Sequence, residues 1–380
     1  MDSALLVCKA FPPIVGGVET FSEQVARAYL RAGIQISVIT QTRGKKGWQR
    51  RNYSEGSVAL YNTGRGGQIA TALKMLWRVF QTTREASFDF YHATTWRPAV
   101  TLIAARRRAP VAVTVHGREV LTTARPLRPV MQAVLNSAST VAVVSAATRD
   151  RADAHLGEAV KVSRWIVANN GLSFATGGQQ TTPAVRVEHL RHSPLRFLTI
   201  ARLVERKNIQ GCLAALRSLR NAGHQNFEYR IAGTGPMADE LRRQVIEAEL
   251  DAQVEFLGYV DDRDIPALYC WADVFLHPQI DLQDGQDFEG FGLSIADAMS
   301  FGCLAIAGNG SGPSDFIRHG VTGILVDGQN YADIRATIFA ILNDPDPHRV
   351  IAAAGQAYVV KELSWDKHVG LVLSAIGGTE

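Results

Sequence analysis

The sequence predicts an α/β protein made of two doubly wound, Rossmann-like domains that face a central cleft. Three observations support this fold class. The chain has 380 residues, a length that fits two domains. Short β-branched runs alternate with longer amphipathic stretches, as in parallel sheets covered by helices on both faces. This alternation stops once, in a polar segment near the middle of the chain, and then begins again.

The first half of the chain contains the first series of expected strands. Between the first two strands, the apolar side chains of Thr20–Ala32 share one helical face, which predicts an amphipathic helix. Strand, helix and strand in repetition indicate a parallel sheet. The expected strands are Leu5–Cys8, Gln35–Thr40, Val58–Tyr61, Phe88–His92, Val111–Val115 and Val141–Val144.

The segment 176–194 divides the chain. It is polar, contains Gly and Pro and has no clear period, so we interpret it as a linker between a domain over 1–175 and a domain over 195–363. The stretch 364–380 has helical spacing and is expected either to cap the second domain or to return to the first. The second domain has expected strands at Arg196–Ile200, Tyr229–Ala232, Val254–Leu257, Val274–His277, Leu304–Ala307 and Gly323–Val326, and expected helices at Asn208–Asn221, Met237–Ala248 and Ser314–Arg318.

The composition excludes several classes of protein. With 46% hydrophobic and 20% charged residues, the chain is neither disordered nor a coiled coil nor collagen-like. No run reaches the length of about 18 apolar residues that a transmembrane helix needs. The acidic start, Met1–Ser3, is not typical of a signal peptide. The four cysteines lie far apart without a CxxC pair, so we expect no disulfide framework, no zinc site and a reducing cytoplasm.

Charge is divided unevenly along the chain. Residues 1–175 hold 23 Lys and Arg and 10 Asp and Glu, a net charge of +13, whereas residues 176–380 hold 17 and 26, a net charge of −9. The basic half suggests an anionic partner such as a membrane surface, a lipid phosphate or nucleic acid, although chance partition of surface charge is the alternative.

The stretch Gln68–Arg84 combines apolar side chains on one side with basic residues elsewhere. Two interpretations remain open. Basic residues with Trp suit docking on an anionic membrane, and a helix that packs its apolar side on the sheet, with a solvated basic face, has the same pattern.

Two features of the first domain follow expected strands. Gly16 and Gly17 precede a helix, where backbone N–H groups bind an anion or simply form a tight turn. This is not a GxGxxG sequence, and no acidic residue follows Thr40, which weighs against a dinucleotide site. His116 ends the strand Val111–Val115, where it could bind a substrate hydroxyl or be a satisfied loop histidine, because ligands of open α/β sheets bind beyond the carboxyl ends of strands.

Two features of the second domain suit a nucleotide. Arg202 and Lys207 lie between a strand and a helix, where two cations and the helix dipole favour a diphosphate. The alternative is solvated surface charge, with Asn208 as a helix cap. Gly233 and Gly235 allow a close approach of backbone to a nucleotide, or form a plain turn.

The segment Asp287–Met299 is the most informative. Glu289 and Asp297 stand eight positions apart across a Gly-rich loop, so one carboxylate could hold sugar hydroxyls and the other a ribose. Ser294 and Asp297 also have the spacing of a capping box, which is the structural alternative. The acidic run 261–264 is better interpreted as a helix N-terminus than as a metal site.

In this order the motifs resemble the retaining nucleotide-sugar glycosyltransferases of family four, which have the GT-B fold. The resemblance covers nearly the whole chain. Besides the residues above, it includes Asn169-Asn170-Gly171, Phe256-Leu257-Gly258-Tyr259 ahead of Leu268-Tyr269, and His319-Gly320-Val321-Thr322-Gly323. Asp297 departs from the pattern, because the family usually has Glu there.

The resemblance implies roles for individual residues. The donor diphosphate is expected at Arg202 and Lys207, the donor sugar at Glu289, the ribose at Asp297, and the transferred sugar and acceptor near His116. Gly16 and Gly17 are expected to close over the donor phosphates, and Trp365 to begin a helix that returns to the first domain. Further donor-binding residues are expected at Gly233, Gly235, Gly290, Phe291, Gly292 and Leu293.

The resemblance also implies an activity. We expect a metal-independent hexosyltransferase with no cofactor, which moves a hexose from a UDP- or GDP-sugar to a saccharide or lipid-linked acceptor hydroxyl with retention. Bacterial-type polysaccharide, lipopolysaccharide or glycolipid assembly is the expected context, in the cytoplasm or peripherally on the inner face of the plasma membrane. A GT-B enzyme of another type, such as a phosphorylase or sugar-nucleotide epimerase, is the first alternative, and a nucleic-acid-binding protein that uses the basic half is the second. A nucleic-acid partner is not expected, because no recognition motif accompanies the basic half.

Overall fold

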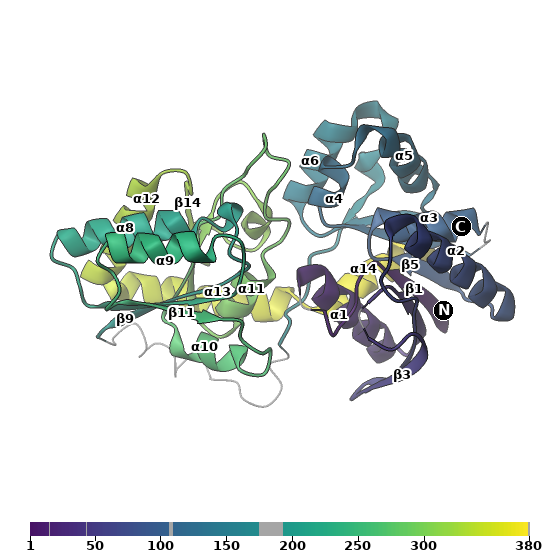
Figure 1. The fold of residues 1–380 in the computed structure, drawn as a ribbon, viewed down its shortest axis with the longest axis horizontal. Helices are drawn as coiled ribbons and strands as arrows, with labels where there is room; N and C mark the ends of the chain where they lie inside the picture. The colour runs from purple at the N-terminus through teal and green to yellow at the C-terminus, as the bar shows by residue number, and fades with distance from the viewer. Residues whose placement is uncertain (15, 43, 106–108, 175–192, 379–380) are drawn as a thin grey trace. The chain divides into compact units, whose positions relative to one another are not determined.

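The computed structural model describes residues 1–14, 16–42, 44–105, 109–174 and 193–378. The chain divides into two compact units, of which the first is Met1–Ser173 with Ser364–Glu380 and the second is Phe174–Leu363 (Figure 1). Apart from its last two residues, the expected linker 176–194 lies outside the described residues.

The first unit is built on a parallel sheet with one antiparallel edge. Within the described residues this sheet has eight strands in the order β3-β4-β2-β1-β5-β6-β7-β8, and only β3 and β4 pair antiparallel. The six predicted strands are confirmed. The strands are β1 (Ser3–Cys8), β2 (Gln35–Thr40), β3 (Gly47–Tyr53), β4 (Gly56–Asn62), β5 (Phe90–Ala93), β6 (Val111–Val115), β7 (Thr140–Val143) and β8 (Ile166–Val167).

Helices cover this sheet (Figure 1). The predicted apolar face of α1 is confirmed, because Phe21, Val25, Ala28 and Tyr29 are buried. The helices are α1 (Gly17–Arg31), α2 (Gln68–Glu85), α3 (Trp96–Ala104), α4 (Arg118–Leu121), α5 (Arg128–Ser137), α6 (Ala146–Leu156) and α14 (Trp365–Gly377).

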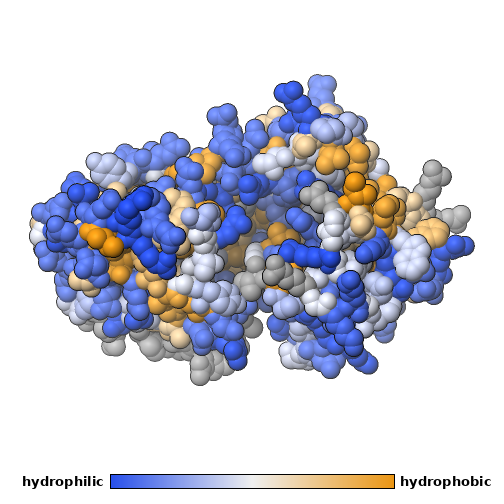
Figure 2. All heavy atoms as spheres, in the orientation of Figure 1, coloured by the Kyte–Doolittle hydropathy of each residue, from blue (hydrophilic) through white to orange (hydrophobic). Residues whose placement is uncertain are grey.

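Helix α2 packs one face into the core of the first unit and leaves a second, apolar face exposed. Its buried positions include Thr71, Met75 and Val79, whereas Ile69, Leu73, Trp77 and Phe80 expose 79%, 60%, 58% and 43% of their surface. The alternative in which this apolar side packs on the sheet is therefore wrong. Figure 2 shows hydrophobic side chains gathered on the face of the first unit where Figure 1 places α2 and α3.

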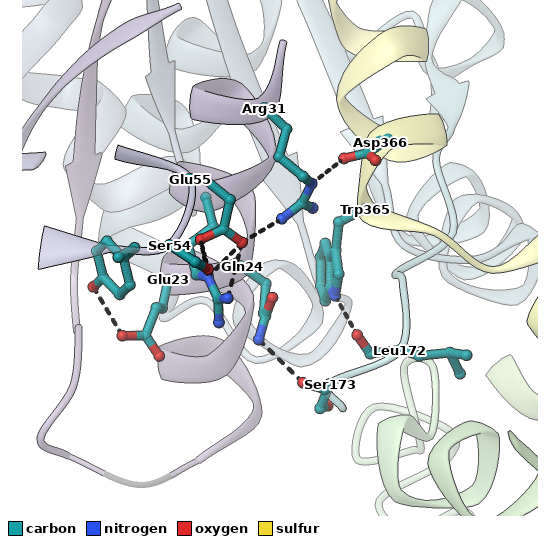
Figure 3. A network of polar contacts seen from close by, with 11 residues as sticks. Glu23, Gln24, Arg31, Ser54, Glu55, Leu172, Ser173, Trp365 and Asp366 are labelled. Atoms are coloured by element: carbon teal, nitrogen blue, oxygen red, sulfur yellow. Dashed lines mark hydrogen bonds and ion pairs between the residues drawn. The ribbon is translucent and has the colours of Figure 1, made fainter. Parts of the chain in front are cut away.

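The chain leaves and re-enters the first unit at one place, which Figure 3 shows. Gln24 Nε2 donates to Ser173 O at 3.2 Å, and Trp365 Nε1 donates to Leu172 O at 2.8 Å. A Cβ on Gly171 would lie 2.3 Å from the Trp365 backbone nitrogen, so only glycine fits there. Helix α14 therefore packs on α1 and is part of the first unit.

The second unit is built on an all-parallel sheet. Within the described residues its six strands follow the order β11-β10-β9-β12-β13-β14. All six predicted strands are confirmed. The elements are β9 (Leu195–Ile200), β10 (Phe227–Ala232), β11 (Val254–Gly258), β12 (Val274–His277), β13 (Leu304–Gly308), β14 (Ile324–Val326), α8 (Ile209–Asn221), α9 (Ala238–Glu247), α10 (Ile265–Trp271), α11 (Leu293–Ser300), α12 (Tyr331–Asn343) and α13 (Pro345–Glu362).

One predicted helix of this unit is wrong. In place of a helix over Ser314–Arg318 there is a short 3-10 turn, η6 (Gly312–Asp315). Thr322 Oγ1 accepts from Arg318 N at 2.8 Å and donates to Phe316 O at 3.1 Å. The threonine thus takes the backbone hydrogen bonds that a continuing helix would use.

Candidate functional site

An ion-pair cluster lies where β9 and β12 end, at the carboxyl edge of the second sheet. The turn η5 (Glu205–Lys207) carries Arg206 and Lys207. Lys207 Nζ donates to Glu289 Oε2 and lies 3.2 Å from His277 Nε2. Arg206 Nη1 donates to the same Glu289 oxygen at 2.6 Å. The structure thus brings together two predicted residues, Lys207 and Glu289, that are far apart in the sequence.

Burial and mutual attraction set the charges of this cluster. Burial lowers the pKa of Lys207, and the charge of Glu289 opposes that shift. Burial by itself would raise the pKa of Glu289, but Lys207 and Arg206 together hold it well below its usual range. Burial, followed by the charge of Lys207, lowers the pKa of His277 to about 4. The cluster is therefore an ionised carboxylate between two cations and a neutral imidazole.

Backbone contacts fix η5 against the end of β12. Arg206 O accepts from Ile280 N at 2.9 Å. Asn208, in the left-handed region with φ of 54°, donates from Nδ2 to Pro278 O at 2.9 Å and to Gly328 O at 2.6 Å. Asn208 is the N-cap residue of α8, but its side chain does not cap the helix. Uncapped N–H groups at a helix start suit an anion.

The turn with Gly233 and Gly235 packs directly on the loop that carries Arg202. A Cβ on Gly233 would lie 1.8 Å from Ala201 O, and one on Gly235 would lie 2.2 Å from Leu203 O. Both glycines are therefore required by backbone packing, whatever they contribute to a ligand. Arg202 itself is exposed, and its charge lowers the pKa of Lys207 further.

The loop before α11 is held by its glycines. Gly292 is the N-cap of α11, with φ of 92°, and no side chain caps that helix. The capping-box interpretation of Ser294 and Asp297 is therefore wrong, because both lie inside the helix. Asp297 is 3% exposed.

The neighbouring predicted residues differ in what they offer a ligand. The ring of Phe291 packs in the core, with its centroid 5.1 Å from that of Phe316. Leu293, the first residue of α11, is half-buried. The carbonyl of Gly290 packs against Gly312, and a Cβ on Gly312 would lie 2.2 Å from Gly290 O.

The carboxyl edge of the first sheet holds His116. Its Nε2 donates to Thr94 O at 2.9 Å, and its ring lies edge-on to that of Phe21, with the two ring centroids 4.7 Å apart. Gly16 and Gly17 begin α1, the helix that carries Phe21, and no side chain caps this helix either. The structure thus places all three predicted residues of the first unit at one edge of its sheet.

Sequence reasoning missed Arg206 and His277. Arg206 adjoins Lys207 in the sequence, and His277 is the last residue of a predicted strand, so position alone could have signalled both. Among the described residues, no group of three or more His, Cys, Asp or Glu could hold a metal ion. In the same part of the chain, every helix is too short or too polar to cross a membrane. Which residues contact a donor stays a prediction.

Two family models together match most of the chain. Residues 16–171 match the glycosyl transferase 4-like domain, and residues 182–358 match the glycosyl transferases group 1 domain. The chain is 28% identical, over 96% of both chains, to a GDP-mannose-dependent alpha-(1-6)-phosphatidylinositol monomannoside mannosyltransferase of Mycobacterium tuberculosis. It is 31% identical to the amylovoran biosynthesis glycosyltransferase AmsK of Erwinia amylovora, over 47% of this chain and 43% of that protein.

Solved structures share the fold. HepE from Anabaena, in complex with UDP and glucose, has a TM-score of 0.76 at 20% identity, over 99% of this chain and 100% of that chain. Sucrose-phosphate synthase from Thermosynechococcus elongatus has a TM-score of 0.76 at 19% identity, over 100% of both chains. The predicted fold class, two Rossmann-like domains of the GT-B type, is confirmed.

Proposed function

This chain belongs to the glycosyltransferases of the GT-B fold, and we propose that it moves a hexose from a UDP- or GDP-sugar to an acceptor hydroxyl with retention at the anomeric carbon. The observation that carries this proposal is the contact of Lys207 with Glu289 at the carboxyl edge of the second sheet. This contact supports the proposal because it joins a cation suited to a diphosphate to a carboxylate suited to sugar hydroxyls.

The central chemical demand is the departure of the nucleoside diphosphate. The bond between the anomeric carbon and the diphosphate oxygen breaks, and its electron pair stays on the diphosphate. Lys207, Arg202 and the uncapped start of α8 stabilise that charge electrostatically. The acceptor oxygen bonds to the anomeric carbon on the face that the diphosphate leaves, and its proton passes to the departing diphosphate oxygen. The residues present suit this chemistry without a metal, so added EDTA should not lower the rate.

His116 is proposed to orient the sugar hydroxyls. Because its Nε2 is occupied by Thr94 O, its Nδ1 is the atom that accepts a hydrogen bond from a hydroxyl. Asp297 is proposed to bind the ribose, with a side chain one methylene shorter than the glutamate of the family pattern.

The base of the donor is tested by measuring thermal unfolding with UDP and GDP in parallel. The relative from Mycobacterium tuberculosis is named for GDP-mannose, and HepE was solved with UDP, so both nucleotides are needed. At ~100 times the dissociation constant, a bound nucleotide stabilises by about 2.7 kcal/mol. We expect a rise in Tm with one nucleotide. No rise with either contradicts the proposed donor site. The anomeric configuration of the product, determined by NMR, tests retention.

We also propose a lipid-linked acceptor and peripheral docking on an anionic membrane. The same relative is named for a phosphatidylinositol monomannoside, which supports a glycolipid acceptor. The four exposed apolar residues of α2 lie on an element that also carries exposed Lys74 and Arg84. Exposed Trp, Phe and Leu beside basic side chains are typical of helices that lie in a membrane interface. The net charge of +13 over residues 1–175 attracts anionic lipid.

Co-sedimentation with vesicles tests this docking. Wild-type protein should bind phosphatidylglycerol vesicles at low salt and phosphatidylcholine vesicles much less. The double variant Leu73→Ser, Trp77→Ser should bind at least roughly tenfold more weakly, because two large side chains no longer enter the interface. The matched control changes Ile246 and Val350, which are 68% and 71% exposed on the second unit, to Ser. Equal binding to both lipids, or equal losses in both variants, contradicts the docking surface.

A further inference from the structure

Arg206 holds one loop of the second unit at both of its ends. Its Nε lies 3.2 Å from Asp287 Oδ1, and its Nη1 donates to Glu289 Oε2 at 2.6 Å. Its backbone carbonyl accepts from Ile280 N at 2.9 Å. One residue of η5 therefore contacts the beginning and the end of the loop over 280–289. Its side chain is 16% exposed, so these contacts are largely shielded from water.

Arg206 and Lys207 share Glu289, but they differ in what they can do there. The ammonium of Lys207 is a compact charge on a flexible chain, whereas the planar guanidinium of Arg206 spans two carboxylates in a fixed geometry. The proposed reaction needs Lys207 at the diphosphate and Glu289 at the sugar. When Lys207 turns toward the diphosphate, Glu289 loses one of its two cations, and a shielded carboxylate without a cation is strongly disfavoured.

We propose that Arg206 is a positioning residue, which keeps Glu289 in place for the donor sugar while Lys207 binds the diphosphate. Arg206 acts through Glu289 and Asp287 and does not itself contact the donor. The kinetic consequences of this inference rest on the proposed function. Its structural consequence, an ordered loop over 280–289, is independent of that function.

The variant Arg206→Met tests the kinetic consequence. We expect kcat to fall by roughly tenfold to a hundredfold, because a charge-assisted hydrogen bond that positions the reacting groups is lost. The dissociation constant of UDP or GDP, measured by calorimetry, should not change, because these nucleotides lack the transferred hexose that Glu289 is proposed to contact.

The pH profile separates charge from geometry. The groups that contact Glu289 are Arg206 and Lys207 from η5 and His277 from β12, and Asp287 of the same loop contacts Arg206. In Arg206→Met the acid limb of kcat should move to higher pH, because a cation is lost and Asp287 remains. Arg206→Lys should restore the acid limb but not the full kcat, because an ammonium cannot span both carboxylates.

Two controls keep the inference falsifiable. Arg220→Met removes an ion pair of the same length, 2.6 Å from Glu249, but one that is exposed, and should behave as wild type. Amide hydrogen exchange without ligand should be faster over 280–289 in Arg206→Met alone. Unchanged exchange over 280–289 overturns the inference, whether or not the wild-type protein turns over a nucleotide sugar. A wild-type protein that turns over no nucleotide sugar contradicts only the proposed function. Equal losses of nucleotide affinity and kcat also overturn it, because Arg206 would then be a phosphate ligand.

Discussion

The two units present different chemistry at the same edge of similar sheets. In the second unit, this edge holds ions, with Glu289 between Lys207 and Arg206. In the first unit it holds an imidazole, that of His116, whose Nε2 donates to the uncharged carbonyl of Thr94 at 2.9 Å. Charged groups suit a nucleoside diphosphate, and neutral hydrogen-bonding groups suit hydroxyls. The two proposed substrates thus match two similar sheets that differ in the charge at their strand ends.

The largest expected effect comes from removing a cation at the edge of the second sheet. Lys207→Ala and Arg202→Ala should each lower kcat by about 10²–10³, the usual loss when one group that stabilises a developing anion is removed. Steady-state kinetics at saturating donor measure this loss. Arg220→Ala, at an exposed ion pair of the same unit, is the control. Near-wild-type turnover of both variants would mean that the edge of the second sheet does not stabilise the charge of the leaving diphosphate.

Acid should weaken the first unit more than the second. Burial lowers the pKa of His92 to about 3 and that of His368 to about 4 in the first unit, and that of His277 to about 4 in the second. The unfolded chain takes up these protons first, below about pH 6.5, so stability falls as pH decreases from there toward the folded-state pKa values. At pH 5 each histidine costs about 2 kcal/mol, and the first unit has one more of them.

Amide hydrogen exchange at pH 7 and pH 5 measures this difference, after correction for the intrinsic exchange rates. Strands β1 and β5 of the first unit should lose more protection than β9 and β12 of the second. Glu289 does not alter this expectation, because its contribution to stability is lost only below the ordinary carboxyl pKa of 4.5, which lies under this pH range. Earlier loss of protection in β9 and β12 would reverse the comparison.

Local patterns in the sequence were sufficient to predict most strands and helices, but not the polar strand at the edge of the first sheet. Buried strands such as β6 and β12 are mostly apolar runs with a single polar residue each, which are easily recognised. Strand β3 was not predicted, because it is a polar edge strand in which every second residue is exposed. The periodicity of α2 correctly gave one apolar face, yet periodicity does not say which face packs on the sheet. That choice depends on the tertiary fold, and here the threonine-containing face is buried.

The candidate site was predictable as a set of residues but not as a network. Lys207 and Glu289 meet because β9 and β12 are neighbours in the sheet, an order that no local pattern encodes. Arg206 has the same sequence signature as any solvated cation, and only the position of Asp287 beside it reveals its contacts. The roles of Gly233 and Gly235 in backbone packing likewise depend on a loop some thirty residues earlier in the chain.

A smaller effect is expected at the edge of the first sheet. His116→Ala should lower kcat by about tenfold, because a neutral hydrogen bond contributes less than a charged one. Nucleotide affinity should remain unchanged, since His116 belongs to the other unit. His224→Ala, which removes a ring contact with Phe339 in the second unit, is the control. A loss as large as that of Lys207→Ala would mean that both edges stabilise charge.

The smallest effect is expected where α14 meets α1. Arg31 Nε donates to Asp366 Oδ1 at 2.7 Å, but the Asp366 side chain is 60% exposed (Figure 3). Exposed ion pairs contribute at most about 1 kcal/mol and weaken in salt. Asp366→Asn should therefore lower the free energy of unfolding, measured in urea, by less than about 1 kcal/mol, and by less still in high salt. A larger loss would mean that charge, rather than the buried Trp365, Val369, Val372 and Ile376, holds this helix on the first unit.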